Sequence, residues 1–147
     1  MNLKFYLLVI FALFALLIGI FVYKGLVSPT IKIDGHTFSL ILAKDEKDKQ
    51  IGLSKYSKID QDKGMLFIFD KADFYPFWMK DMKFPIDIIF INGNKIVTIY
   101  AEVPTSNGNL ILYTPTEPAD RVLEVKAQTS TKYNFKVGDS VEYKNIR

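Results

Sequence analysis

The pattern of hydrophobic and polar residues divides this chain into an apolar amino-terminal run and a longer amphipathic part. The run from Phe5 to Tyr23 holds nineteen residues without a charge or a proline, and Lys4 and Lys24 flank it. A helix of that length reaches about 28 Å, close to the hydrocarbon thickness of a bilayer. Tyr6 and Tyr23 suit the headgroup region, and the two lysines can extend outward. The pattern predicts one transmembrane helix, with residues 1–28 as anchor and short linker.

A cleavable secretory signal and a buried core helix are the alternatives to a retained anchor. Signals usually have a shorter apolar region followed by a small-x-small cleavage site, whereas Leu26 and Pro29 surround Ser28 here. The pattern therefore favours a lipid bilayer as partner of the segment from Phe5 to Tyr23. Lysines on the two sides nearly balance, but a four-residue tail leaves little to be cytoplasmic, so we expect the globular part outside the cytoplasm.

Residues 29–147 read as short strands joined by turns. Two runs, 31–33 and 37–43, are separated by Asp34-Gly35 and predict a hairpin. Two further runs, 86–91 and 95–103, are separated by Asn92-Gly93, which suits a two-residue type I′ turn. Residues 65–69 are apolar on both faces, which is typical of a central strand covered on each side.

The remaining segments complete an α+β pattern with little helix. Residues 45–53 are mixed in charge, with Ile51 and Leu53 as apolar contacts, and predict a short helix against the sheet. Four more extended segments follow, 77–80, 110–113, the alternating 121–127, and 140–143. We expect a single domain with a mostly antiparallel curled sheet or barrel, one or two short helices, and the transmembrane helix before it.

Composition limits the classes of function. Hydrophobic residues make up 49% of the 147-residue chain, too many for a disordered protein, and about 120 residues are enough for one core. Residues 29–147 carry 17 basic and 16 acidic side chains, a net charge of +1, so no nucleic-acid partner is expected. The chain has no cysteine, which excludes disulfides, thiol catalysis and cysteine-based zinc sites.

Candidate binding chemistry concentrates between residues 77 and 91. Asp87 interrupts an apolar strand, and a buried carboxylate must find a partner or change its protonation. It is either a structural acceptor or part of a site, with Lys80 and Lys126 as possible partners. If Lys80, Asp81 and Asp87 converge beside Trp78, they form a polar spot with an aromatic wall, as small-ligand sites do. Trp78 itself either anchors the core or lines a groove.

Catalytic templates are mostly absent from the sequence. The single histidine, His36, falls in a predicted turn, and no G-x-S-x-G motif accompanies it, so a serine triad is not expected. Neither a metal nor another cofactor is expected. The calcium-like spacing of Asp60, Asp62 and Gly64 ends at Lys71, where a bidentate glutamate would be required. A carboxylate pair such as Asp81 and Asp87 is suited to acid–base work on a sugar, but the sequence does not fix their separation.

Several motifs together resemble one known family. They are GLS at 52–54, DKGMLFIF at 62–69, FWMKDMKFPIDIIFI at 77–91, VLEVKA at 122–127 and KVGDSV at 136–141. Their order and spacing resemble the DUF192 family, also called UPF0127, over roughly residues 37–143. The resemblance implies a compact domain on a curled sheet, often exported or membrane-tethered in bacteria and archaea, without an agreed activity. The chain departs from the family at Ser54 (usually Met), Asp81-Met82 (Asn-Thr) and Ala127-Gln128 (Ala-Gly).

These observations lead to three functional hypotheses. The first is a membrane-anchored, extracytoplasmic binding or accessory module of the cell envelope. Its groove would lie near Trp78, Lys80 and Asp87, and its partner would be a small envelope ligand or a membrane protein. The second is an enzyme that processes an envelope saccharide or peptide with carboxylates near Trp78. The third is a purely structural interaction domain.

Overall fold

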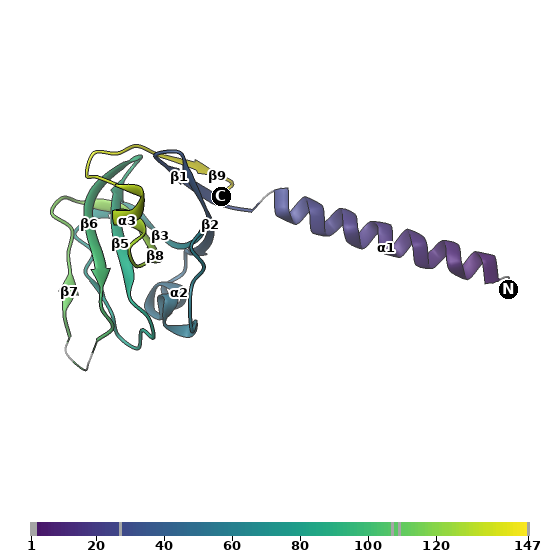
Figure 1. Cartoon of the computed structure of the whole chain (residues 1–147), viewed down its shortest axis with the longest axis horizontal. Helices are drawn as coiled ribbons and strands as arrows, with labels where there is room; N and C mark the ends of the chain where they lie inside the picture. The colour runs from purple at the N-terminus through teal and green to yellow at the C-terminus, as the bar shows by residue number, and fades with distance from the viewer. Residues whose placement is uncertain (1–2, 27, 107, 109, 147) are drawn as a thin grey trace.

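The computed structural model describes residues 3–26, 28–106, 108 and 110–146, which form an amino-terminal helix and a β-rich domain (Figure 1). The helix α1 (Leu3–Leu26) projects from the domain, and its side chains from residue 5 to residue 22 are exposed. It is long and apolar enough to cross a membrane, a property that signal sequences share. The side chains of Lys4, Tyr23 and Lys24, with their predicted interfacial roles, lie outside the described residues.

Seven strands of the described residues form one sheet in the order β6-β5-β8-β3-β2-β1-β9, and two short strands, β4 and β7, form a second. Neighbouring strands are antiparallel except for the parallel pair of β2 and β3. The strands are β1 (Thr30–Ile33), β2 (His36–Ala43), β3 (Lys63–Asp73), β4 (Phe77–Trp78), β5 (Ile86–Asn92), β6 (Lys95–Val103), β7 (Leu112–Tyr113), β8 (Ala119–Lys126) and β9 (Val141–Lys144).

The large sheet curls until its first and last strands meet. The backbone N–H of Ile96 donates to the carbonyl of Asp139 at 3.0 Å, and the N–H of Gly138 donates to the carbonyl of Ile96 at 2.8 Å. A third bond joins the Val141 N–H to the Asn94 carbonyl at 2.8 Å. The predicted fold class, a mostly antiparallel curled sheet preceded by an apolar helix, is confirmed.

The two faces of the sheet bury separate apolar clusters. Each of the seven strands contributes to the inner cluster, which includes Leu66 and Leu123. The next residue along β3, Phe67, and the residue before Leu123 on β8, Val122, belong to the outer cluster, because successive side chains point to opposite faces of a strand. The prediction of a doubly covered strand at 65–69 is thus confirmed.

The prediction for residues 121–127 is only partly correct. The segment is a strand, but β8 does not alternate between a buried and a solvated face. Residues 122–125 are all buried, because β8 lies between β3 and β5 and is covered on both sides. The acidic residue Glu124 is therefore inside the protein.

The two predicted hairpins form, and one turn is displaced. Asp34-Gly35 joins β1 to β2 with positive φ angles of 43° and 82°, as expected for a type I′ turn. In the second hairpin Asn92 pairs with Lys95, so the turn residues are Gly93 and Asn94 instead of the predicted Asn92 and Gly93.

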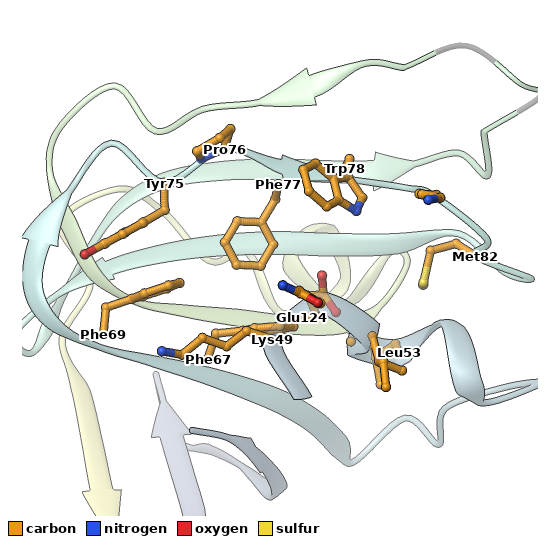
Figure 2. Close-up of a pocket in the computed structure, with 14 residues that line it drawn as sticks. Lys49, Leu53, Phe67, Phe69, Tyr75, Pro76, Phe77, Trp78, Met82 and Glu124 are labelled. Atoms are coloured by element: carbon orange, nitrogen blue, oxygen red, sulfur yellow. The ribbon is translucent and has the colours of Figure 1, made fainter. Parts of the chain in front are cut away.

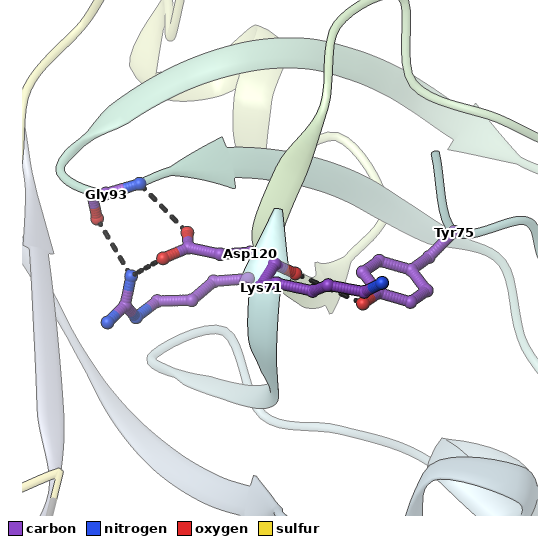
Figure 3. A network of polar contacts seen from close by, with 5 residues as sticks. Lys71, Tyr75, Gly93 and Asp120 are labelled. Carbon is purple, nitrogen blue, oxygen red and sulfur yellow. Dashed lines mark hydrogen bonds and ion pairs between the residues drawn. The ribbon is translucent and has the colours of Figure 1, made fainter. Parts of the chain in front are cut away.

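Contacts with β8 account for the position of the second turn. Asp120 Oδ1 accepts a hydrogen bond from the Gly93 N–H at 2.9 Å, and Arg121 Nη1 donates to the Gly93 carbonyl at 3.3 Å (Figure 3). Arg121 Nη1 also lies 2.6 Å from Asp120 Oδ2. This ion pair holds both polar groups of Gly93, whose φ of 59° a glycine adopts without strain.

Short helical segments pack against both apolar clusters of the sheet. The predicted helix at 45–53 is present as α2 (Glu46–Ile51), capped by Asp45, followed by the 3-10 turn η1 (Gly52–Lys55), which buries Leu53. A third helix, α3 (Thr129–Tyr133), was not predicted from the sequence. The layer formed by α2, η1 and β4 leaves a cavity above the sheet.

Candidate functional site

A cavity of about 160 Å³ lies between the outer face of the sheet and the layer formed by α2, η1 and β4. Figure 2 shows Phe77 and Trp78 on one side of it, Phe67, Lys49 and Leu53 on the other, and Glu124 between them. We call it the Glu124 pocket. Its lining residues are Lys49, Gln50, Ile51, Gly52, Leu53, Phe67, Phe69, Tyr75, Pro76, Phe77, Trp78, Lys80, Met82 and Glu124.

Aromatic rings fix the shape of the pocket. The Phe77 ring packs edge-to-face on Phe67, with ring centroids 4.9 Å apart. Phe69 stacks on Tyr75 with centroids 3.8 Å apart, and the Tyr75 hydroxyl donates to the Lys71 carbonyl at 3.1 Å (Figure 3). Because these contacts hold the rings in place, the pocket is preformed rather than dependent on a ligand.

Glu124 supplies the acidic group of the pocket. It pairs with Met65 on β3 and with Ile88 on β5, so its side chain enters the outer apolar layer together with that of Val122. The residue is 4% exposed, and Oε2 has no hydrogen-bond partner in the described part of the chain. Burial raises the pKa of the Glu124 carboxyl to about 8, so the group is mostly protonated and neutral at pH 7.

Gly52 keeps space open beside this carboxyl. Its φ is 54°, and its N–H donates to the Asp48 carbonyl at the end of α2. A Cβ at this position would lie 3.4 Å from Phe67 Cζ and 3.9 Å from Glu124 Oε2. A side chain larger than hydrogen would therefore occupy the part of the pocket next to the acid.

Cationic and aromatic groups form the rim. Lys49 Nζ lies 3.0 Å from Glu46 Oε1 and 4.9 Å from the centroid of the Phe69 ring. Lys80 is exposed, and Trp78 is 43% exposed. Trp78 also lines a larger surface depression of about 530 Å³, together with Asp81, Leu110 and Ile111. Trp78 therefore stands between two concave sites and is not the core anchor that was one alternative.

The structure separates the sequence-predicted site residues into two groups. Trp78 and Lys80 line both the Glu124 pocket and the adjoining depression, and Asp81 lines the depression alone. Lys126 borders a different surface pocket beside Lys58 and Glu102. Of the three residues predicted to converge beside Trp78, Lys80 and Asp81 do so, and Asp87 does not.

Asp87 is occupied by backbone donors. It is fully buried, and its Oδ1 accepts from the N–H groups of Glu102 at 2.8 Å and Gln128 at 3.1 Å. Oδ2 accepts from the N–H of Ser130 at 2.6 Å. The Asp87 carboxylate thus has the geometry of a structural acceptor, which was one of the two alternatives considered for it.

Sequence reasoning did not select Glu124. The residue lies in the motif VLEVKA, where an acid between apolar residues carries the same signal that marked Asp87. The apparent alternation of that segment suggested a solvent-facing side chain. Only the central place of β8 in the sheet shows that the acid is buried.

The chemistry available in the pocket is that of one protonated carboxylic acid among aromatic rings. In the described residues, no three histidine, aspartate or glutamate side chains are grouped to hold a metal ion. Glu124 can donate or accept a hydrogen bond, or ionise against a cation. Among the residues that line the pocket it is the one carboxyl group.

Comparisons with known proteins identify relatives of the domain. A crystal structure of a protein of unknown function from Novosphingobium aromaticivorans superposes with a TM-score of 0.70 at 26% identity, covering 78% of this chain and 83% of the other. A proposed transcription regulator from Sinorhizobium meliloti gives a TM-score of 0.71 at 28% identity, covering 79% and 93%. A search of curated proteins gives no match. The model of the DUF192 family, described as "Uncharacterized ACR", matches residues 29–143, and the chain therefore belongs to this family.

Proposed function

We propose that this protein is a membrane-tethered binding module that takes a small, partly apolar molecule into the Glu124 pocket. The observation that carries the proposal is the buried Glu124 carboxyl, which has an unpartnered oxygen and faces a preformed aromatic cavity. Buried polar groups are almost always hydrogen-bonded, so an unpaired oxygen that faces a cavity supports a partner that enters the cavity. A ligand in the pocket would supply that partner.

The single tryptophan gives a direct test of binding. Because Trp78 lines the pocket and is the one tryptophan of the chain, its fluorescence reports on occupancy. The full chain in detergent would be titrated with a fragment set, and retained molecules would be sought by native mass spectrometry. We expect a fragment or retained ligand to change Trp78 emission in the parent and to bind more weakly in Glu124→Gln.

Glu142→Gln is the matched control, because Glu142 is an exposed acid on β9 that does not line the Glu124 pocket. The control should bind like the parent. Equal binding by the parent and Glu124→Gln would contradict the proposed role of the carboxyl. Absence of any binding across the set would contradict the binding function itself.

The tether and its location are part of the same proposal. The exposed apolar surface of α1 supports insertion of the segment from Phe5 to Tyr23 into a bilayer, with the domain on the extracytoplasmic side near an envelope ligand. Carbonate extraction of membranes should leave the intact chain in the pellet, and protease added to spheroplasts should digest the domain. Release by carbonate, or a mature chain that begins after residue 26, would overturn the tether.

An enzyme that acts on an envelope saccharide or peptide is the second candidate. The observation that favours it is the raised pKa of Glu124, since a protonated glutamate in an apolar site is suited to general acid catalysis. Sugar hydrolysis usually requires a second carboxyl group, and Asp81 lies in the adjoining depression. Turnover of wall fragments that is lost in both Glu124→Gln and Asp81→Asn would favour the enzyme over the binding module.

A further inference from the structure

The Glu124 pocket combines an acid with aromatic faces, the two groups that proteins use to hold organic cations. Phe67, Phe69, Phe77, Tyr75 and Trp78 supply rings on several sides of the cavity. The negative face of each ring attracts a cation, and the attraction grows where water is excluded. The Glu124 oxygen without a partner is positioned to accept a hydrogen bond from the same cation.

One ammonium group already occupies a ring face of this pocket. Lys49 Nζ lies 4.9 Å from the Phe69 ring centroid, and the Lys49 side chain is only 17% exposed. Glu46 balances its charge at 3.0 Å. The wall of the pocket thus accepts a partly desolvated ammonium once a carboxylate is available to neutralise it.

The other charged groups leave the acid available. Glu124 faces Met65 and Phe67 from β3 and Ile88 from β5, all apolar. The titratable or charged side chains that line the pocket from the covering layer are Lys49, Tyr75 and Lys80. Lys49 is paired, Lys80 is exposed and screened by solvent, and the Tyr75 hydroxyl is bound to the Lys71 carbonyl.

From this arrangement we infer that the ligand of the Glu124 pocket is a small organic ammonium whose charged nitrogen meets the Glu124 carboxyl while its apolar part lies among the rings. The inference rests on the proposed binding function and names the chemical class of its ligand. A cavity of about 160 Å³ holds a molecule the size of a substituted benzene ring.

Binding of an ammonium moves a proton from the protein to the solvent. In the empty pocket the carboxyl holds its proton at neutral pH, because no positive charge offsets its burial. A bound ammonium keeps its own protons and favours the carboxylate, so the Glu124 proton leaves to the buffer. Near pH 6.5 we therefore expect about one proton released per ligand bound.

Three probes that share a benzene ring but differ in their polar group distinguish an ammonium from a neutral or an anionic ligand. Benzylamine, benzyl alcohol and benzoate would be titrated into the full chain in detergent at pH 6.5, with Trp78 fluorescence for affinity. Calorimetry in two buffers of different ionisation heat would count protons. We expect benzylamine to bind most tightly and to lose about tenfold or more in affinity in Glu124→Gln, while benzyl alcohol changes less than about threefold.

Glu124→Asp keeps the experiment informative if the glutamine variant does not fold. It retains the acid but withdraws it by one methylene, so proton release should persist at reduced affinity. Preference for benzoate, or benzylamine binding without proton release, would overturn the ammonium inference and leave the binding function standing. Failure of all three probes and of the fragment set would instead count against the binding function.

Discussion

The Asp87 carboxylate on β5 accepts a 2.6 Å hydrogen bond from the backbone N–H of Ser130, the second residue of α3. The same side chain binds the N–H groups of Glu102 and Gln128, whose φ angles of 54° and 71° are left-handed. One buried carboxylate thus connects the sheet, the end of β6 and the start of α3. Asp87 is therefore a structural residue, and its replacement should lower the free energy of unfolding.

Replacement of Asp87 by Asn should destabilise the domain by about 2–3 kcal/mol, because an amide nitrogen would face backbone donors that now meet a carboxylate oxygen. Urea unfolding would measure the change. Asp45→Asn is the control, since Asp45 is an exposed helix cap and asparagine caps equally well. An Asp87→Asn variant as stable as Asp45→Asn would show that the three contacts contribute little.

Stability should depend on pH through Glu124. Its pKa is about 8 in the folded protein against an ordinary value of 4.5, so the folded state holds a proton that the unfolded chain releases. The stabilising contribution of this bound proton is fully present below pH 4.5 and is lost as pH rises toward 8, by about 1.4 kcal/mol per pH unit at most. Unfolding of the parent and of Glu124→Gln at several pH values should give curves that diverge over this window. Parallel curves would contradict the protonated state.

Gly52→Ala should reduce ligand binding beyond its effect on stability. Gly52 and Gly93 have similar φ angles of 54° and 59°, but a Cβ at Gly93 meets no atom within 4 Å. Gly52 also has a ψ of −143°, in a region essentially restricted to glycine, so Gly52→Ala should lose about 1–3 kcal/mol from backbone strain. Gly93→Ala should lose about 1–2 kcal/mol. Only Gly52→Ala places a methyl group beside Phe67 and Glu124, so it alone should weaken fragment binding in the Trp78 titration. Equal binding by both variants would place the ligand elsewhere.

Gln128→Gly should stabilise the domain. Gln128 has a φ of 71°, a left-handed conformation that glycine adopts without strain, and the backbone N–H that binds Asp87 is retained in the variant. Relief of strain should outweigh the lost 3.3 Å contact of Gln128 Nε2 with Glu102, for a net gain of about 0.5–1 kcal/mol in unfolding free energy. Asn134→Gly, at a φ of 56°, should gain less because asparagine tolerates this conformation. A lower melting temperature for Gln128→Gly would contradict this account.

Much of the fold followed from local patterns in the sequence. Doubly apolar residues 65–69 became a central strand, and Asp34-Gly35 became a turn with two positive φ angles. The second turn moved by one residue because Asp120 and Arg121, distant in sequence, hold Gly93. Turn residues specify a turn, whereas tertiary contacts decide its register.

The candidate site was harder to predict, because two buried acids carry the same sequence signal. Asp87 and Glu124 each interrupt an apolar strand, yet backbone donors surround one and aromatic rings surround the other. The difference arises from α2 and β4, which fold over β8 from distant parts of the chain. Trp78 and Lys80, which the sequence suggested because their own segment is rich in rings and charge, do line the pocket, and their role in binding stays a prediction.

The meeting of β6 with the segment before β9 bears on how such domains coexist at a crowded surface. Copies held in a membrane by α1, as proposed, would diffuse in two dimensions and collide often, and unpaired strand edges would then invite sheet-to-sheet fusion. Backbone bonds at residues 94–96 and 138–141 shorten both terminal edges of the seven-stranded sheet. For a domain tethered as proposed, closure of the sheet would therefore keep neighbouring copies separate, each with its own pocket accessible.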